Sequence, residues 1–259
     1  MTAEVTPSDR IKTERNGHIL VITIDRPEAR NAFDHISSQG MQEAMDLLDN
    51  TDELFIGIIR SSSEHFCAGA DLKAAAKGGT RSTERGGFGI LKRPSRKPLI
   101  AAVEGYAVGG GFEMCLACDI IIASETAKFG LPEVRHNVVA IGGGLFRLPK
   151  RMPHHLAMEM ALTGEFRDAD YMYKWGVINQ LTDAGKAFEA ALAFAEKMLP
   201  NGPTAVAASK EIIFQSTEWN EKEAWAKQMD IANIALKSED RTEGLKAFAE
   251  RRKPIWKGR

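Results

Sequence analysis

The sequence predicts an α/β protein with largely parallel strands, and two observations support this prediction. Short runs of β-branched and apolar residues recur in the first half of the chain, and amphipathic helical stretches lie between several of them. Because these runs are apolar at nearly every position, both faces of the sheet are expected to be covered. The expected strands are 18–24, 55–59, 99–103 and 120–123.

The first helix is predicted over 36–50, where Met41, Ala44, Met45 and Leu48 fall on one face. From Met152 onward the chain is expected to be helical, with Gly or Pro between the helices. Asn201-Gly202-Pro203 is the clearest internal boundary. We therefore expect a core of residues 1–200 and a C-terminal helical region of residues 201–259. The helices expected after Met152 are 155–163, 169–175, 186–199, 204–216, 220–236 and 240–252.

The segment Lys73–Lys92 interrupts this pattern. It is rich in Gly, Ala, Arg and Lys. This composition indicates a mobile surface segment, either a lid or a solvated loop with no role.

Composition excludes several classes of protein. The 259 residues include 34 Lys and Arg against 35 Asp and Glu, so no excess of positive charge indicates nucleic-acid binding. No apolar run reaches the roughly 18–20 residues of a membrane span. The first 15 residues are polar and partly acidic, unlike a signal or transit peptide. We therefore expect a cytoplasmic protein without a membrane or nucleic-acid partner.

Three cysteines, Cys67, Cys115 and Cys118, do not make a disulfide framework. Cys115 and Cys118 form a C-x-x-C pair, which would suit a redox or metal site. A zinc site would need further ligands, and Cys67 alone does not supply them. We favour two small buried side chains one helical turn apart, and we expect no metal.

The most informative stretch is Gly105–Glu113, in which a strand runs into Gly109, Gly110 and Gly111 and then into a helix. Glycines at such a turn let a ligand approach the backbone, and free N–H groups at a helix start can bind an anion or oxyanion. A tight turn alone would not require three glycines, so we favour a functional role.

A second turn of small residues, His65–Asp71, follows the strand expected at 55–59 and precedes a short helical run. Asp71 is well placed as the N-cap of that helix. Two strand-end turns with free N–H groups could hold one carbonyl oxygen from two sides.

Two glutamates stand next to these motifs. Glu113 directly follows the glycines, and Glu133 ends the stretch Phe129-Gly-Leu-Pro-Glu133. Apolar, Gly and Pro surroundings predict burial and a shifted pKa for both carboxyl groups. Such a pair suits general acid and base chemistry.

As a set, these motifs resemble the crotonase (enoyl-CoA hydratase/isomerase) superfamily, from about Ile11 to Arg259. Within it, Asp71–Ala76, Arg147–Lys150 and the ending Ala247–Arg259 look especially similar to the carnitinyl-CoA dehydratase branch. The matching motifs are Ala68-Gly-Ala-Asp71, Lys97-Pro98, Gly105 to Glu113, Cys118-Asp119, Phe129-Gly130 and Pro132-Glu133.

The resemblance implies a spiral of ββα turns with a C-terminal helical trimerisation region, assembled as a trimer or a dimer of trimers. It implies an oxyanion hole at the N–H groups of Ala70 and Gly110. Phe248 and Arg251 match positions that reach the coenzyme A of a neighbouring subunit. The other residues implied to line the coenzyme A ester are Ala68, Ala70, Asp71, Leu72, Lys73 and Gly110.

The resemblance also implies a reaction. Hydratases of the family have a glutamate at both positions, whereas isomerases typically keep only the second. Glu113 would deprotonate the water that attacks C3, and Glu133 would act as the acid toward C2. Neither a metal nor a redox cofactor is needed, and coenzyme A is part of the substrate. The expected function is hydration of a 2-enoyl-CoA in fatty acid metabolism.

The sequence departs from the hydratase pattern after Glu133. Asn137 stands where Gly is usual and Ala140 where Pro is usual, while Ile141 replaces a small or polar residue. This segment borders the acyl pocket in the family. An apolar Ile141 weakens the case for carnitine as the acyl group.

Two other functions stay open. One is another reaction of the family, either carnitinyl-CoA dehydration (crotonobetainyl-CoA hydration) or enoyl-CoA isomerisation. The other is a non-catalytic protein that keeps the fold and binds coenzyme A. The paired glutamates argue against the binding protein, which has no need to bury two acids.

Overall fold

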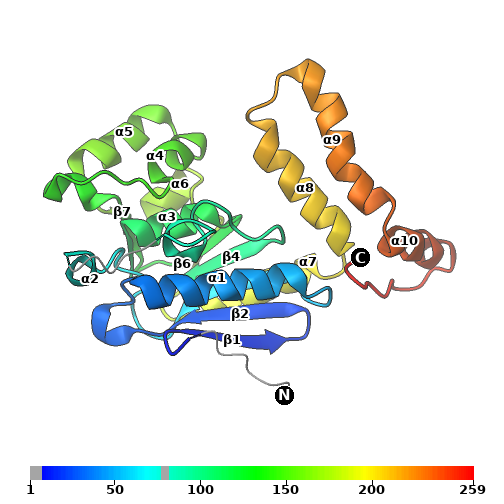
Figure 1. Ribbon diagram of the computed structural model, residues 1–259, viewed down its shortest axis with the longest axis horizontal. Coiled ribbons are helices and arrows are strands. Elements are labelled where there is room, and N and C mark those ends of the chain that lie inside the picture. Colours follow the sequence, from blue (N-terminus) through cyan, green and yellow to red (C-terminus); the bar gives the residue numbers. More distant parts are fainter. Residues whose placement is uncertain (1–7, 77–81) are drawn as a thin grey trace.

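The computed structural model describes residues 8–76 and 82–259 and confirms the α/β class. Its main sheet has the strand order β1-β2-β3-β4-β6-β9. β1 pairs antiparallel with β2, and every further neighbouring pair is parallel (Figure 1). The strands are β1 (Ile11–Asn16), β2 (Ile19–Ile24), β3 (Ile56–Ser61), β4 (Leu99–Val103), β6 (Ile120–Ser124) and β9 (Gln180–Thr182).

Helices cover both faces of this sheet, which explains why its strands are apolar at nearly every position. Along β2, Leu20 and Ile22 belong to one core and Ile19 and Val21 to another, because successive side chains point to opposite faces. On the first face lies α1 (His35–Asn50), which buries Met41, Met45 and Leu48. On the second lies α7 (Ala187–Met198), which buries Ala187, Ala191 and Ala195.

A second, smaller sheet follows the main one. It consists of β5 (Tyr106–Val108), β7 (Lys128–Gly130) and β8 (Arg167–Asp168), with β7 in the middle. The chain passes from β4 to β5 through residues 104–105 and then enters α3 (Gly110–Ala117). The sequence did not predict the strands of this sheet, because runs of two or three residues are too short to show a period.

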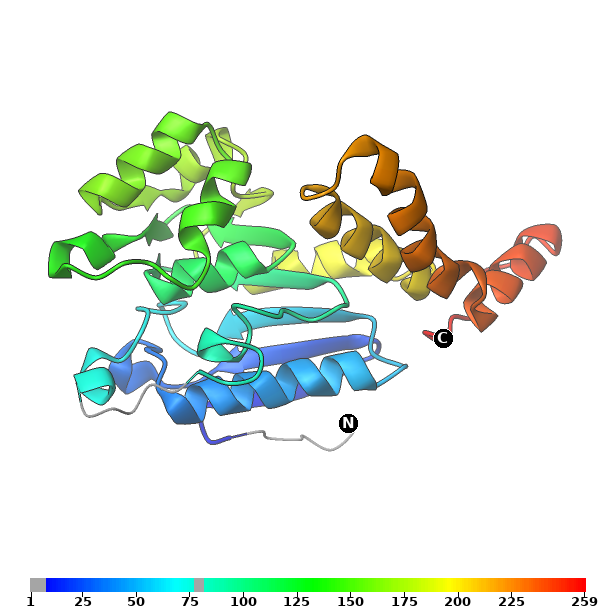
Figure 2. The ribbon, with the colours of Figure 1, turned by 45° about the horizontal axis from the view of Figure 1, so that its top comes forward.

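The chain after Met152 is mostly helical, as predicted, but it also contributes the short strands β8 and β9, which were not predicted. The helices α5 (His154–Thr163) and α6 (Ala169–Lys174) belong to the core, whereas α8 (Pro203–Ser216) and α9 (Glu221–Leu236) lean away from it. α10 (Glu239–Ala249) lies at the far end (Figure 2). In the part of the chain that the structure describes, no helix has the length and apolar character to cross a bilayer. The division of the chain at residue 200 and the cytoplasmic location stay predictions.

The prediction of a surface segment at Lys73–Lys92 is wrong for its second half. The 3-10 helix η2 (Gly87–Gly89) packs against α1, and Arg85, Ile90 and Leu91 are buried. A Cβ atom at Gly89 would overlap the carbonyl oxygen of Ser38 in α1. The Gly- and Arg-rich composition therefore reflects close backbone packing and a buried charge. α2 (Leu72–Ala76) is exposed at its start, and Ser82, Glu84 and Lys92 are exposed as well. Residues 77–81 lie outside the described residues.

The three cysteines are buried free thiols, in agreement with the structural interpretation of the C-x-x-C pair. Burial raises the pKa of Cys67 and of Cys118 to about 12. Their thiols are therefore protonated at neutral pH and poorly suited to redox or metal chemistry.

Candidate active site

The turn at Ala70 is fixed from one side by the segment around Phe33. The Phe33 N–H donates to Gly69 O and the Asp71 N–H donates to Phe33 O, both at 2.9 Å. In this parallel bridge the N–H of Ala70 points away from Phe33. Asp71 caps α2 by accepting from the Lys73 and Ala74 N–H groups, and its carboxylate pairs with Arg26 at 2.8 Å. The Ala74 N–H and Arg26 hold the pKa of Asp71 below its usual value.

The glycine turn before α3 touches the Ala70 turn. The Cys67 N–H donates to Tyr106 O at 2.9 Å and the Val108 N–H donates to Cys67 O at 3.0 Å. A Cβ atom built on Gly69 would lie 3.4 Å from the nitrogen of Gly110. Among the described residues, neither the Ala70 N–H nor the Gly110 N–H has a hydrogen-bond acceptor. Free backbone N–H groups at neighbouring turns are the type of donor that stabilises an oxyanion.

Glu113 lies in the first turn of α3 and is only 4% exposed. Its Oε1 accepts a hydrogen bond from the Gly144 N–H at 2.9 Å, at the start of α4 (Gly144–Arg147). Burial raises the pKa of Glu113, and the N–H groups of Gly144 and Gly142 and the charge of Arg147 oppose the rise. The predicted burial and pKa shift are thus confirmed.

Glu133 lies in the first turn of the 3-10 helix η3 (Pro132–His136) and is half-buried. A Cβ atom on Gly109 would lie 3.2 Å from its Oε1, so the carboxylate faces the glycine turn. Its Oε2 is buried and has no hydrogen-bond partner within residues 8–76 and 82–259. Burial raises the pKa of Glu133, its own backbone N–H opposes this rise, and the negative charge of Glu113 adds to it. The carboxylates of Glu113 and Glu133 are therefore close enough for the charge of Glu113 to affect the pKa of Glu133.

Of the other predicted site residues, Ala140 and Ile141 precede the glycine that lies against Glu113, whereas Phe248 and Arg251 lie apart from this centre. Ala140 is buried, and the Ile141 side chain is 89% exposed beside Gly142. Phe248 on α10 and Arg251 after it are exposed, and α10 lies at the opposite end of the molecule from α2 in both views (Figures 1 and 2). One chain therefore does not bring them to its own α2. The remaining residues line the Ala70 turn and α2: Ala68 is half-buried, and Leu72 and Lys73 are exposed.

Several residues that enclose the site were not predicted from the sequence. Phe88 has a left-handed backbone conformation with φ +56°. Its ring stacks on the ring of Phe33, with 4.6 Å between the two ring centroids. The same ring fills the space that a Cβ atom at Gly110 would need. Gly144 and Arg147 were also missed as site residues. The signal for Gly144 was present, because Gly142–Gly144 is a glycine triplet at a helix start, as Gly109–Gly111 is.

The departure at Asn137 has a backbone explanation. Asn137 ends η3 at φ +55°, a left-handed conformation that Gly adopts freely and Asn tolerates better than most residues. The exchange of Gly for Asn therefore preserves the turn.

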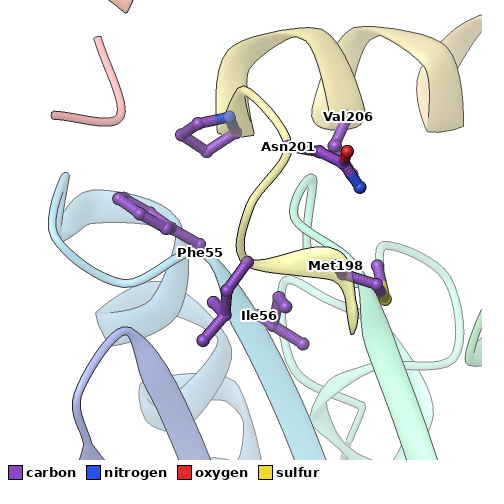
Figure 3. A pocket seen from close by; sticks show the side chains of 7 residues that line it. Phe55, Ile56, Met198, Asn201 and Val206 are labelled. Carbon is purple, nitrogen blue, oxygen red and sulfur yellow. The ribbon is translucent and has the colours of Figure 1, made fainter. Parts of the chain in front are cut away.

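A separate small pocket lies where the core meets α8, and Figure 3 shows it from close by. No ionisable side chain lines it, so it offers no acid or base. Its lining residues are Phe55, Ile56, Met198, Leu199, Asn201, Pro203 and Val206.

Comparison with known proteins identifies the family. The family model described as enoyl-CoA hydratase/isomerase matches residues 14–259. The chain belongs to the enoyl-CoA hydratase/isomerase family. This membership confirms the resemblance inferred from the motifs, and it confirms an enzyme of the enoyl-CoA hydratase type.

Relatives within the family cover nearly the whole chain. The carnitinyl-CoA dehydratase of Salmonella typhimurium is 41% identical over 261 residues, which span 97% of this chain and 100% of that protein. A crystal structure of a probable enoyl-CoA hydratase/isomerase from Mycobacterium abscessus superposes with a TM-score of 0.94 at 49% identity, covering 97% of this chain and 100% of the other. The enoyl-CoA hydratase structure from Mycobacterium tuberculosis gives 0.93 at 47% identity, with 96% and 99% covered. These superpositions confirm the spiral fold of the family.

Proposed function

We propose that this enzyme reversibly adds water across the 2,3-double bond of a 2-enoyl-CoA thioester. The observation that supports this most is the pair of carboxylates, Glu113 and Glu133, which face one site beside two free backbone N–H groups. A protein that only binds coenzyme A would gain nothing from burying two acids, because a buried carboxylate costs free energy.

The N–H groups of Ala70 and Gly110 would hold the thioester carbonyl oxygen. When water adds to C3, negative charge develops on this oxygen, and two fixed donors stabilise that charge. In other enzymes the loss of one such donor costs about 2.7–4 kcal/mol of transition-state stabilisation.

The environments of the two glutamates favour different protonation states. Glu113 accepts from backbone N–H groups and lies near Arg147, and both favour its carboxylate form. Glu133 has an unpartnered oxygen and faces the negative charge of Glu113, and both favour its protonated form. Such a difference in environment supports Glu113 as the base and Glu133 as the acid.

Catalysis then follows from these states. Glu113 takes a proton from water as the oxygen bonds to C3, and the C2–C3 double bond shifts to an enolate. Glu133 gives its proton to C2, which re-forms the thioester carbonyl. The net change is one hydroxyl group on C3 and one hydrogen on C2, and proton exchange with solvent restores both glutamates.

The assembly belongs to the same proposal. We infer a trimer or a dimer of trimers in which coenzyme A lies along Ala68–Lys73 and meets Phe248 and Arg251 of a neighbouring subunit. Exposed apolar side chains on α8 and α9, among them Ile213, Trp225 and Ile234, support burial against other subunits. A cytoplasmic location remains part of this proposal.

Carnitinyl-CoA dehydration is the second candidate. The 41% identity to proteins named carnitinyl-CoA dehydratase favours it, as does the likeness of the C-terminus. An isomerase is less well supported, because both glutamates are present.

The test follows the loss of the conjugated enoyl-thioester absorbance with crotonyl-CoA and, separately, with crotonobetainyl-CoA. Glu113→Gln and Glu133→Gln should each reduce hydration severely and leave CoA-ester binding nearly intact, because the amide keeps the shape but cannot exchange the proton. If either variant kept the wild-type turnover, the two-carboxylate mechanism would be wrong.

A further inference from the structure

Arg147, the last residue of α4, is a buried cation without a carboxylate in ion-pair contact. Its side chain is 9% exposed, and within the described residues no ion pair includes it. Its Nη1 donates to Gly142 O at 3.1 Å and its Nη2 donates to Leu91 O at 2.7 Å. A buried guanidinium is costly unless nearby groups compensate its charge, so this placement calls for a reason.

The two carbonyl groups that Arg147 binds belong to the two segments that enclose the Glu113 carboxylate. A Cβ atom on Gly142 would touch Glu113 Oε2, and it would lie 2.5 Å from Cδ1 of Leu91. Gly144, in the same turn as Gly142, donates its N–H to Glu113 Oε1 at 2.9 Å. By binding both carbonyls, one planar guanidinium joins the glycine turn to the segment that follows η2.

The charge of Arg147 also acts on this carboxylate. Glu113 faces Glu133 from η3 and Arg147 from α4, and Arg147 in turn faces Arg151 and the Cys118 thiol. Arg151 directs its Nη2 to Cys118 O at 2.9 Å. Burial raises the pKa of Cys118 to about 12, so this thiol carries no charge at neutral pH. After the N–H groups of Gly144 and Gly142, the charge of Arg147 therefore opposes the rise that burial causes in the pKa of Glu113.

We propose that Arg147 is a positioning residue for Glu113, which holds the glycine turn against the carboxylate and whose charge favours the ionised form of that carboxylate. The proposal rests on the assignment of Glu113 as the base. It requires both the forked shape of the guanidinium, which reaches two carbonyls, and its charge. Lysine keeps the charge but loses the fork.

The experiment compares R147M and R147K by the pH dependence of kcat/KM for crotonyl-CoA hydration. In R147M we expect the acidic limb of the profile to move to higher pH by about one unit, because an opposite charge near the carboxylate is lost. In R147K the limb should stay near its wild-type position, while kcat falls about tenfold through the loosened turn. R151M is the matched control, since Arg151 is a half-buried arginine that donates to a carbonyl outside the Glu113 turn. Its acidic limb should not move.

A second readout needs no substrate and so separates this proposal from the proposed function. The stability difference between Glu113→Gln and its parent, measured against pH, reports the titration of Glu113 by linkage. In the R147M background this titration should move to higher pH, and in R151M it should not. A wild type that hydrates no enoyl-CoA would contradict the proposed function, whereas an unmoved Glu113 titration in R147M would overturn the role of Arg147.

Discussion

The guanidinium of Arg85 donates to the carboxylate of Asp49 with 2.6 Å between Nη2 and Oδ2, and both side chains are buried. Asp49 also accepts from Ser95 Oγ at 2.6 Å and from the Arg96 N–H at 2.9 Å. This pair fastens the segment before η2 to α1. It thereby holds Phe88 and Leu91 beside the site.

Asp49→Ala should destabilise the protein by about 3–5 kcal/mol, because it removes the buried carboxylate that pairs with Arg85 and leaves only the exposed Asp46 to compensate this buried charge. Chemical denaturation measures this change in the free energy of unfolding. Asp46→Ala is the matched control, because Asp46 binds the same guanidinium but is 41% exposed. Its loss should cost less than about 1 kcal/mol. Equal effects of the two variants would mean that burial of the Asp49 pair does not matter.

The same pair explains why Lys73–Lys92 was predicted as a surface segment although its second half is buried. Gly, Arg and Lys are typical of solvated loops, and nothing local to Lys73–Lys92 indicates that Arg85 meets an aspartate in α1, 36 residues earlier. The central strands could be predicted because their apolar runs are local. β1 could not, because its edge position leaves only Ile11 and Thr13 buried among polar residues.

The residues of the candidate site also form two groups, those that the local sequence indicates and those that only contacts between distant segments bring there. Glu113, Glu133 and the glycine turn stand out because their neighbours in the sequence are unusual for a glutamate or for a single turn. Phe88 and Arg147 join the site through contacts between distant segments: Phe88 lies over Gly110, and Arg147 binds the carbonyl of Leu91. No periodicity or spacing in one sequence records such contacts.

The active-site carboxylates should reduce the stability of the fold. The pKa of Glu113 and of Glu133 is raised in the native state, so each carboxyl binds its proton more tightly when folded. Binding this proton more tightly stabilises the folded state. The stabilisation is complete below the unfolded pKa of about 4.3 and is lost as the pH rises through the folded pKa, where the carboxyl is buried as a charge. Glu113→Gln and Glu133→Gln should therefore melt at a higher temperature than the wild type at pH 8, and their advantage should shrink toward pH 4.

Thermal melts between pH 4 and pH 8 measure this trend. Glu196→Gln, an exposed position on α7, is the control and should follow the wild type at every pH. A variant of Glu113 or Glu133 that is less stable than the wild type at pH 8 would contradict the destabilising role of that carboxylate.

The exposed apolar side chains of α8 and α9 lead to a prediction about assembly. Trp225 is 68% exposed, Ile213 and Ile234 are each 70% exposed, and α9 has no buried residue. Residues from about 204 to the C-terminus should bury these side chains between subunits, so light scattering should give a trimer or a hexamer. A stable monomer at micromolar concentration would refute this assembly.

The helix surface can be tested directly. Trp225→Glu together with Ile234→Glu should shift the protein toward smaller species, because two charges would be buried without partners. Lys222→Glu changes an exposed polar residue at the start of α9 and should leave the assembly intact. If the double variant assembled like the wild type, α9 would not lie in the interface.

The last prediction concerns Ile141, whose side chain is 89% exposed next to the glycine that contacts Glu113. Burying an apolar side chain against the hydrocarbon of a substrate is favourable by about 25 cal/mol per Å². Opposite a quaternary ammonium group, isoleucine offers neither a charge nor an aromatic face. An uncharged short or medium 2-enoyl-CoA should therefore be hydrated with a higher kcat/KM than crotonobetainyl-CoA. In Ile141→Asp the ratio of the two kcat/KM values should move toward crotonobetainyl-CoA, whereas in the control Val139→Asp, also exposed and two residues away, it should not. A clear wild-type preference for crotonobetainyl-CoA would overturn this argument and favour carnitinyl-CoA dehydration, the reaction named for the relatives of 41% identity.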